Sequence, residues 1–191
     1  GSMSVSGNNR NGIINYSNSL QGGDATITSI TNTGSIAGSV SGGYSIVNAG
    51  IIGTLNNSQG TGNASGALTY YGYLPTEYNI IINSADQYGQ LAVTSGLGTT
   101  TFGISSLSTT NSSILNTALD SVLSGVASSL LLNTRGTSNG FTFELSETTS
   151  GSGIWNLLIT SCSVCAVSDI TAGTTVSLDE VGADPILSGG T

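Results

Sequence analysis

The two cysteines are the most reactive side chains in this 191-residue sequence. Cys162 and Cys165 have the C-x-x-C spacing of a redox pair or of half a zinc site. A redox pair needs a helix N-terminus to lower one thiol pKa, and the sequence around the cysteines indicates no helix. Zinc needs four ligands, but the chain has no further Cys and no His. We expect either a local disulfide in an exported protein or two inert thiols.

Acidic residues offer a second kind of chemistry. Because the chain has no His, a Ser-His-Asp triad and an imidazole general base are excluded. Polysaccharide-cleaving enzymes use clustered carboxylates instead. The candidates for such a cluster are Glu144, Glu147, Asp169 and Asp179. These residues do not recur at matching positions along the chain, so we predict that the protein is not an enzyme and keep a polysaccharide-degrading enzyme as the alternative.

The net charge of the chain limits the classes of partner that it can bind. Arg10 and Arg135 are the only basic residues against ten acidic ones, and the net charge of -8 repels nucleic acids and anionic lipid headgroups. The acidic run of Asp179, Glu180 and Asp184 lacks the regular spacing of a calcium loop, so we expect a solvated segment and no metal or cofactor. No apolar stretch reaches the ~20 residues that span a bilayer, so we expect no membrane insertion.

Tyrosines form the one dense aromatic group. Tyr70, Tyr71 and Tyr73 stand close together, and Tyr78 and Tyr88 follow them. Tyrosine gives a large contact area with a polar tip, which fits a protein or sugar partner. The same side chains also fit the core of a capping region. Both interpretations stay open, and Tyr70, Tyr71 and Tyr73 are the candidate contact surface.

The composition indicates which elements hold these residues. Charged residues make up 6% of the chain and Lys is absent, whereas 37% of residues are hydrophobic, enough for a continuous core. Solubility must then come from hydroxyls and amides, which favours β-structure covered in Ser, Thr and Asn. Gly1, Ser2 and Met3 look like a cloning scar and are left out of the fold prediction.

An internal repeat predicts the architecture. Residues 30–36 (ITNTGSI) return sixteen residues later as residues 46–52 (IVNAGII), with Ile, Asn, Gly and Ile at matching places. Strand alternation points the isoleucines of the repeat into a shared interior. We expect them to form aligned ladders; they are Ile30, Ile36, Ile46 and Ile52.

The other repeated residues suit the corner of a stacked coil. We expect Asn32 and Asn48 to stack on each other and to hydrogen-bond from coil to coil. Gly34 and Gly50 would permit a positive φ in the turn. Because a single coil cannot bury its Ile face, the coils must stack. The sequence therefore predicts an all-β chain folded as a right-handed parallel β-helix.

The C-terminal half is predicted to cap this solenoid. Apolar residues at helical spacing predict one short helix over residues 114–126, with an N-cap at residues 111–113 and a stop at Gly125. The expected organisation is a scar at 1–3, coils at 4–69, further coils and a cap at 70–160, and a terminal strand or acidic linker at 161–191. The cap would protect the last coil from edge-to-edge aggregation.

The repeat, residues 70–82 (YYGYLPTEYNIII) and residues 88–93 (YGQLAV) resemble the passenger region of bacterial autotransporter adhesins. The resemblance covers roughly residues 9–160. It implies a barrel-proximal β-helix fragment of a type V secretion passenger, exported to the cell surface or the extracellular space. It also implies a non-enzymatic stalk or adhesin. The expected partners are a protein or glycan on a host or neighbouring cell, or a second copy of the chain.

Overall fold

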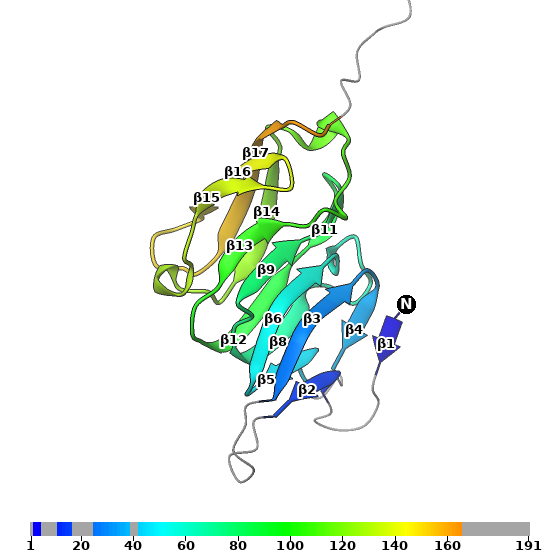
Figure 1. The fold of residues 1–191 in the computed structure, drawn as a ribbon, viewed down its shortest axis with the longest axis vertical. Coiled ribbons are helices and arrows are strands. Elements are labelled where there is room, and N and C mark those ends of the chain that lie inside the picture. The colour runs from blue at the N-terminus through cyan, green and yellow to red at the C-terminus, as the bar shows by residue number, and fades with distance from the viewer. Residues whose placement is uncertain (1, 5–10, 17–24, 39–41, 166–191) are drawn as a thin grey trace, which may run out of the picture.

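The computed structural model describes residues 2–4, 11–16, 25–38 and 42–165, and these form an all-β chain. Its body is a parallel β-solenoid of about three turns. Antiparallel strands close one end of the solenoid (Figure 1). The predicted all-β parallel β-helix is confirmed. Within the described residues, no helix is long and apolar enough to cross a membrane.

Strands account for nearly all of the regular structure. Two single 3₁₀ turns, η1 (Ser112–Ile114) and η2 (Ser128–Leu130), interrupt them. The strands are β1 (Ser2–Ser4), β2 (Ile13–Asn15), β3 (Thr26–Asn32), β4 (Ser35–Ala37), β5 (Ile46–Asn48), β6 (Ile51–Asn57), β7 (Gly60–Thr61), β8 (Leu68–Tyr73), β9 (Glu77–Ile80), β10 (Ile82–Ser84), β11 (Gln87–Gly89), β12 (Leu91–Leu97), β13 (Thr101–Ile104), β14 (Ala118–Ser124), β15 (Arg135–Ser138), β16 (Phe141–Glu147) and β17 (Trp155–Cys162).

Two sheets enclose the core. Sheet I has the order β15-β16-β17-β14-β12-β8-β5-β2, and sheet II has the order β13-β9-β6-β3. Within the solenoid, β2, β5, β8 and β12 are parallel neighbours in sheet I, as are β3, β6, β9 and β13 in sheet II. Each coil therefore contributes one strand to each sheet. A small sheet of β10-β11-β7 and the pair β1-β4 complete the fold.

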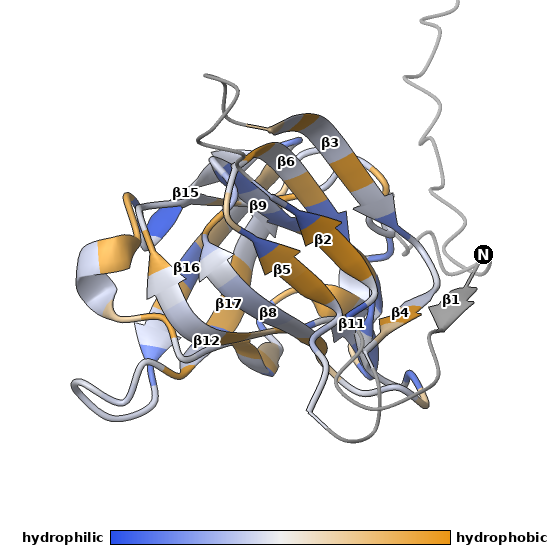
Figure 2. Cartoon of the chain, turned by 90° about the horizontal axis from the view of Figure 1, so that it is seen from below, coloured by the Kyte–Doolittle hydropathy of each residue, from blue (hydrophilic) through white to orange (hydrophobic). Residues whose placement is uncertain are grey.

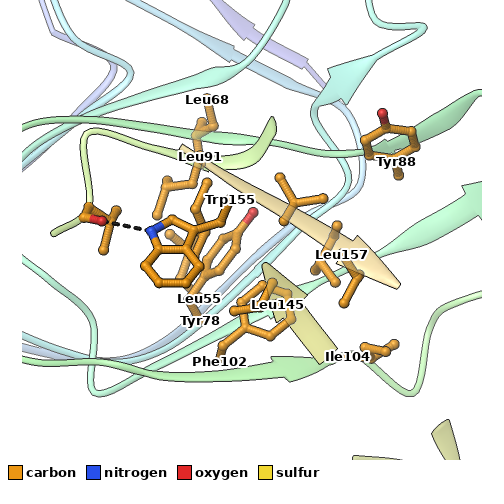
Figure 3. Close-up of a cluster of buried hydrophobic side chains, with 14 of the residues drawn as sticks. Leu55, Leu68, Tyr78, Tyr88, Leu91, Phe102, Ile104, Leu145, Trp155 and Leu157 are labelled. Carbon is orange, nitrogen blue, oxygen red and sulfur yellow. Dashed lines mark hydrogen bonds between the residues drawn. The ribbon is translucent and has the colours of Figure 1, made fainter. Parts of the chain in front are cut away.

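The core lies between the two sheets because alternate side chains of each strand point inward. The close-up in Figure 3 shows large apolar side chains of both sheets meeting there. All of the following are at most 5% exposed: Leu55, Tyr78 and Phe102 from sheet II, and Leu68, Leu91 and Trp155 from sheet I. The indole Nε1 of Trp155 donates to the Val126 carbonyl at 2.8 Å, so the polar atom of the largest core side chain is satisfied.

Successive coils of sheet II are separated by 23 to 25 residues. Thr26 pairs with Ile51, Thr54 pairs with Glu77, and Glu77 pairs with Thr101. The predicted sixteen-residue stacking period is therefore wrong. The two similar strings do not belong to stacked strands. Residues 30–32 end β3 of sheet II, whereas residues 46–48 form β5 of sheet I.

The predicted isoleucine ladders are wrong for the same reason. Ile30 stacks on Leu55, Ile52 stacks on Ile27, and Ile46 lies between Ile13 and Tyr70. The inward direction of these side chains nevertheless agrees with their alternation. Ile46 and Ile52 are at most 1% exposed, and Ile36 is 7% exposed, whereas Ile30 is only partly buried.

Two asparagine corners explain why the repeated strings look alike. Asn48 Oδ1 accepts from the Gly50 amide at 3.1 Å, and Asn32 Oδ1 accepts from the Gly34 amide at 3.2 Å. Each side chain thus bends back onto the amide two residues ahead, as in an Asx turn. Each corner also bonds between coils, but to a different asparagine than predicted. The bonds run from Asn15 Nδ2 to Asn48 Oδ1 at 2.8 Å and from Asn32 Nδ2 to Asn57 Oδ1 at 3.0 Å.

The glycines of these corners were expected to permit a left-handed backbone turn. Neither Gly34 nor Gly50 has a positive φ, so the predicted left-handed turn is wrong. A Cβ at Gly50 would lie 2.2 Å from the Ala25 carbonyl oxygen and 2.9 Å from Asn15 Nδ2. Gly50 is therefore needed because the neighbouring coil approaches its backbone.

The helix predicted over residues 114–126 is also wrong. This segment holds the single turn η1, which Asn111 caps by accepting from the Ser113 amide at 2.9 Å, and then strand β14. Ser121 has a φ of 52° inside β14, and the pairing of β14 with β17 shifts register between Leu119 and Leu123. This bulge changes the phase of the side chains, so that Leu119, Val122 and Leu123 are all fully buried. A bulged strand thus reproduces the spacing of a helix.

The domain boundaries expected from the sequence can be compared with the strands of the structure. Residue 70 lies inside β8, and coil stacking continues through β13 to Ile104. Residues 2–4, most of which were left out as a scar, form β1 and pair with β4. Arg10 and the acidic tail with Asp169, Asp179, Glu180 and Asp184 lie outside the described residues.

Candidate contact surface

The three tyrosines of strand β8 divide between the core and the surface. Tyr70 is fully buried, and its hydroxyl donates to the Tyr73 carbonyl. Burial raises the pKa of Tyr70 above its ordinary value of 10.0. Tyr71 and Tyr73 are 41% and 49% exposed. Tyr70 is therefore a core residue and drops out of the candidate surface, because alternation within one strand separates it from its neighbours.

Tyr71 belongs to a row of outward side chains that crosses sheet I. It stands in register with Val47 of β5 on one side and Thr94 of β12 on the other, and Val47 is in register with Ile14 of β2. Ile14 is 49% exposed. The ring of Tyr44 packs against that of Tyr71, with centroids 5.2 Å apart. Such cross-strand pairs stabilise a sheet face and place apolar groups side by side.

A second row continues this apolar surface. Tyr73 is in register with Leu97, which is 50% exposed. Tyr16 follows Ile14 at the outward parity and is 68% exposed. We name the combined surface the tyrosine face; it consists of Ile14, Tyr16, Tyr44, Val47, Tyr71, Tyr73 and Leu97. Figure 2 shows that β2 and β5, the strands that carry Ile14 and Val47, are coloured as hydrophobic.

The outer side of sheet II is polar by comparison. One row across its strands consists of Ser29, Thr54, Glu77 and Thr101, and the next consists of Thr31, Asn56, Asn79 and Gly103. Some of these side chains bond along the row: Asn56 Nδ2 donates to Thr31 Oγ1 at 3.2 Å. Ile51 of β6 is 45% exposed, but its register partner is Thr26, so rows of exposed apolar side chains are a property of sheet I.

The candidate carboxylates have structural partners. Glu144 forms an exposed ion pair with Arg135, with Oε1 and Nη2 3.3 Å apart. Glu147 accepts from the amides of Gly151 and Gly153 at 3.0 and 2.7 Å and so closes the turn between β16 and β17. Within the part of the chain that the structure describes, no group of three or more His, Cys, Asp or Glu residues lies close enough to hold a metal ion.

The two cysteines lie at the end of the last strand. Cys162 and Cys165 form a disulfide with a Cα–Cα distance of 5.4 Å. The Ser163 amide between them donates to the Gly140 carbonyl at 2.8 Å, which ties the closed loop to the turn between β15 and β16. The pair therefore closes a local loop at the edge of the cap.

Comparison with protein-family models, with curated proteins and with solved structures finds no match for the chain. Tyr71 and Tyr73 were candidates from the sequence, whereas the other members of the tyrosine face were not. These members could have been recognised because residues 14, 16 and 47 are apolar at outward-facing positions. That pattern becomes visible only when the coils are aligned in the correct register.

Proposed function

We propose that this protein is a non-enzymatic contact protein of the cell surface, a stalk or adhesin that binds its partner through the tyrosine face. The parallel β-solenoid of about three turns is consistent with a passenger β-helix, and the resemblance of residues 9–160 to autotransporter passengers supports export to the cell surface. A stacked solenoid suits this role because it is rigid along its axis and offers a long surface.

The exposed apolar rows of the tyrosine face carry the proposal. Ile14, Tyr71, Tyr73 and Leu97 are each between 41% and 50% exposed. They lie on β2, β8 and β12 of sheet I, and Val47 of β5 stands between Ile14 and Tyr71. Contiguous apolar patches on otherwise polar proteins mark interaction sites. Tyrosines are enriched where proteins bind each other, because each ring contributes a large contact area and its hydroxyl stays satisfied. The best-fitting partner is a protein on a neighbouring or host cell, with a surface glycan or a second copy as further candidates.

A binding assay with matched variants tests the proposal. The purified protein is applied to cells, immobilised matrix glycoproteins, a glycan panel and an immobilised copy of itself. The double variant Tyr71→Ser/Tyr73→Ser should lose binding at least about tenfold, since each buried aromatic anchor contributes more than about 1 kcal/mol. The double variant Thr31→Ala/Asn56→Ala on sheet II should bind like the wild type.

Two outcomes would count against a contact function through this face. One is the absence of binding to any of the four kinds of surface. The other is equal loss of binding in the two double variants. Release of reducing ends from a polysaccharide panel would instead support the alternative of a carbohydrate-degrading enzyme.

A further inference from the structure

A polar groove lies on the outer side of sheet II, where the hairpin of β15 and β16 rises beside β9 and β13. It has a volume of about 240 Å³ and is lined by Glu77, Asn79, Thr101, Gly103, Asn133 and residues 136–139, with the rings of Phe102 and Phe143. Sheets I and II point their outer faces away from each other, so this groove is separate from the tyrosine face.

The floor of the groove depends on a glycine. A Cβ at Gly103 would lie 2.2 Å from Asn79 Oδ1 and 3.1 Å from Ser138 Oγ. Gly103 therefore leaves the room in which the Asn79 carboxamide lies. Within the described residues this carboxamide makes no hydrogen bond, although amides of the same kind at the two corners are fully used. An amide that is free in a groove can bond a ligand without breaking an internal contact.

The far wall of the groove is held in place before any ligand binds. Asn133 pairs with the backbone of β13 as a strand would, accepting from the Phe102 amide at 2.8 Å and donating to the Phe102 carbonyl at 3.0 Å. Ser138 Oγ and Asn139 Nδ2 both donate to the Ile104 carbonyl, at 3.0 and 2.7 Å. Because the wall is pinned by these bonds, binding would cost little ordering entropy.

The chemistry of the lining selects the class of ligand. The only charged group in the groove is the Glu77 carboxylate, and the described arginine, Arg135, is paired with Glu144. A phosphate, sulfate or carboxylate ligand would therefore meet repulsion without a compensating cation. The remaining polar groups, the Asn79 amide and the Thr101 hydroxyl, both donate and accept hydrogen bonds, whereas the Thr137 hydroxyl already pairs with that of Thr142 at 3.3 Å. Adjacent sugar hydroxyls have the same double character.

The volume of the groove agrees with that of a single sugar ring. Pockets for drug-sized ligands span roughly 300–1,000 Å³, and this groove is smaller. The rings of Phe102 and Phe143 lie beneath it with centroids 5.3 Å apart and are each only 2% exposed, so a ligand would be held by hydrogen bonds and not by ring stacking. We propose that this groove binds one neutral sugar residue of a surface glycan, with Asn79 and Glu77 as its hydrogen-bonding groups.

The test is titration of the isotope-labelled protein with neutral monosaccharides, followed by backbone amide shifts in NMR. Glucose, galactose, mannose and N-acetylglucosamine are the probes, with glucose 6-phosphate as the charged comparison. At least one neutral sugar should shift the amides of residues 77–79 and 101–103 with a dissociation constant of about 1 mM. Glucose 6-phosphate should bind at least about tenfold more weakly than glucose.

Matched variants separate the groove from the rest of the face. Asn79→Ala and Gly103→Ala should each weaken sugar binding at least tenfold, whereas Asn56→Ala should change it less than twofold, since Asn56 stands beside Asn79 in the same row but outside the lining. An amide spectrum of Asn79→Ala that matches the wild type outside the groove is the control that the fold is kept. The proposal is overturned if no neutral sugar shifts these amides, if the charged sugar binds more tightly, or if Asn56→Ala weakens binding equally.

Discussion

The two ends of the solenoid differ in how their strand edges are covered. At the C-terminal end, β14 extends sheet I beside β12, β17 pairs with β14, and the Asn133 side chain stands in for a strand beside β13. At the other end, β2 and β3 are the outermost strands of their sheets among the described residues. At the capped end these strands and the Asn133 side chain therefore cover the edges of both sheets, which limits edge-to-edge pairing there.

Burial follows the same difference. Ile27 and Ile30 of the first coil are only partly buried, although their register partners Ile52 and Leu55 in the second coil are at most 1% exposed. The residue types and inward parity are alike in both coils. What differs is the number of neighbouring coils, because a stacked coil gains packing from both sides and a terminal coil from one. The contribution of an isoleucine to the free energy of unfolding thus depends on the position of its coil in the stack.

The largest expected effect is at the capped end. The change Trp155→Ala removes a side chain that is 5% exposed and leaves the Val126 carbonyl without its donor. It should lower the free energy of unfolding by about 3–5 kcal/mol. Tyr16→Ala at the open end, where the side chain is 68% exposed, is the control and should stay within ~0.5 kcal/mol. Denaturant titration measures both; a cost below about 1 kcal/mol for Trp155→Ala would show that the cap unfolds independently.

A pair of isoleucines in one register tests the difference between coils directly. Ile52→Ala in the second coil should cost about 2–5 kcal/mol, because it opens a cavity among fully packed neighbours. Ile27→Ala in the first coil should cost less than half as much, since its side chain already contacts solvent. Both values come from urea denaturation followed by circular dichroism. Equal costs would mean that the first coil is covered as well as the second.

The asparagine corners allow the same comparison for polar groups. The Asn57 side chain makes four hydrogen bonds, donating to the Gln59 and Gln90 carbonyls and accepting from the Gln59 amide and from Asn32 Nδ2. Asn57→Ala should cost about 1–3 kcal/mol, because it leaves buried partners unsatisfied. Asn56→Ala, on the outer side of the same strand, should change stability by under ~0.5 kcal/mol. Thermal denaturation of the two variants decides whether the inward amide is the structural one.

The disulfide at the capped end should contribute less. Cys162 and Cys165 close a loop of four residues, so the entropy that the bond removes from the unfolded chain is small, about 2 kcal/mol or below. Reduction should lower the melting temperature by only a few degrees. A scanning calorimetry run with and without reductant tests this, with a Cys162→Ser/Cys165→Ser variant as the control. A fall of more than about ten degrees would show that the pair holds the cap together.

The smallest effect at neutral pH is expected for Tyr78→Phe. The Tyr78 hydroxyl is buried near the Asn57 side chain but makes no hydrogen bond of normal geometry in the described chain, so its removal should change stability by less than about 1 kcal/mol. Burial raises the pKa of Tyr78 above its ordinary value of 10.0. The folded state thus keeps the proton more tightly than the unfolded state, and the stability is fully present below about pH 10 and falls as the pH rises further.

The pH dependence gives this prediction its measurement. Urea titrations at pH 7 and at about pH 11 should show a smaller loss of stability for Tyr78→Phe than for the wild type. Tyr71→Phe, whose ring is 41% exposed, serves as the control for loss of one tyrosine. An equal loss of stability in all three proteins would contradict a buried, neutral Tyr78.

Much of the fold was predictable because it depends on local sequence. Composition and the absence of His limited the chemistry, and alternation predicted that Ile36, Ile46 and Ile52 point inward. The Asn-x-Gly strings marked two real corners, since an Asx turn forms from residues that are two apart in the chain. The candidate site was predictable only in part. Of the three candidate tyrosines, Tyr71 and Tyr73 are exposed, whereas Tyr70 is buried in agreement with the alternative that these side chains form core.

The stacking itself was decided by the tertiary structure. Coil length depends on loops of unequal length, so the register that joins Asn32 to Asn57 and Asn15 to Asn48 is absent from any fixed sequence period. The bulge at Ser121 imitates helical spacing, and only pairing with β17 shows a strand. The tyrosine face and the polar groove combine residues from several coils. Local sequence set which way each side chain points, while long-range strand pairing chose its neighbours, because parallel strands pair only after the chain has closed a whole coil.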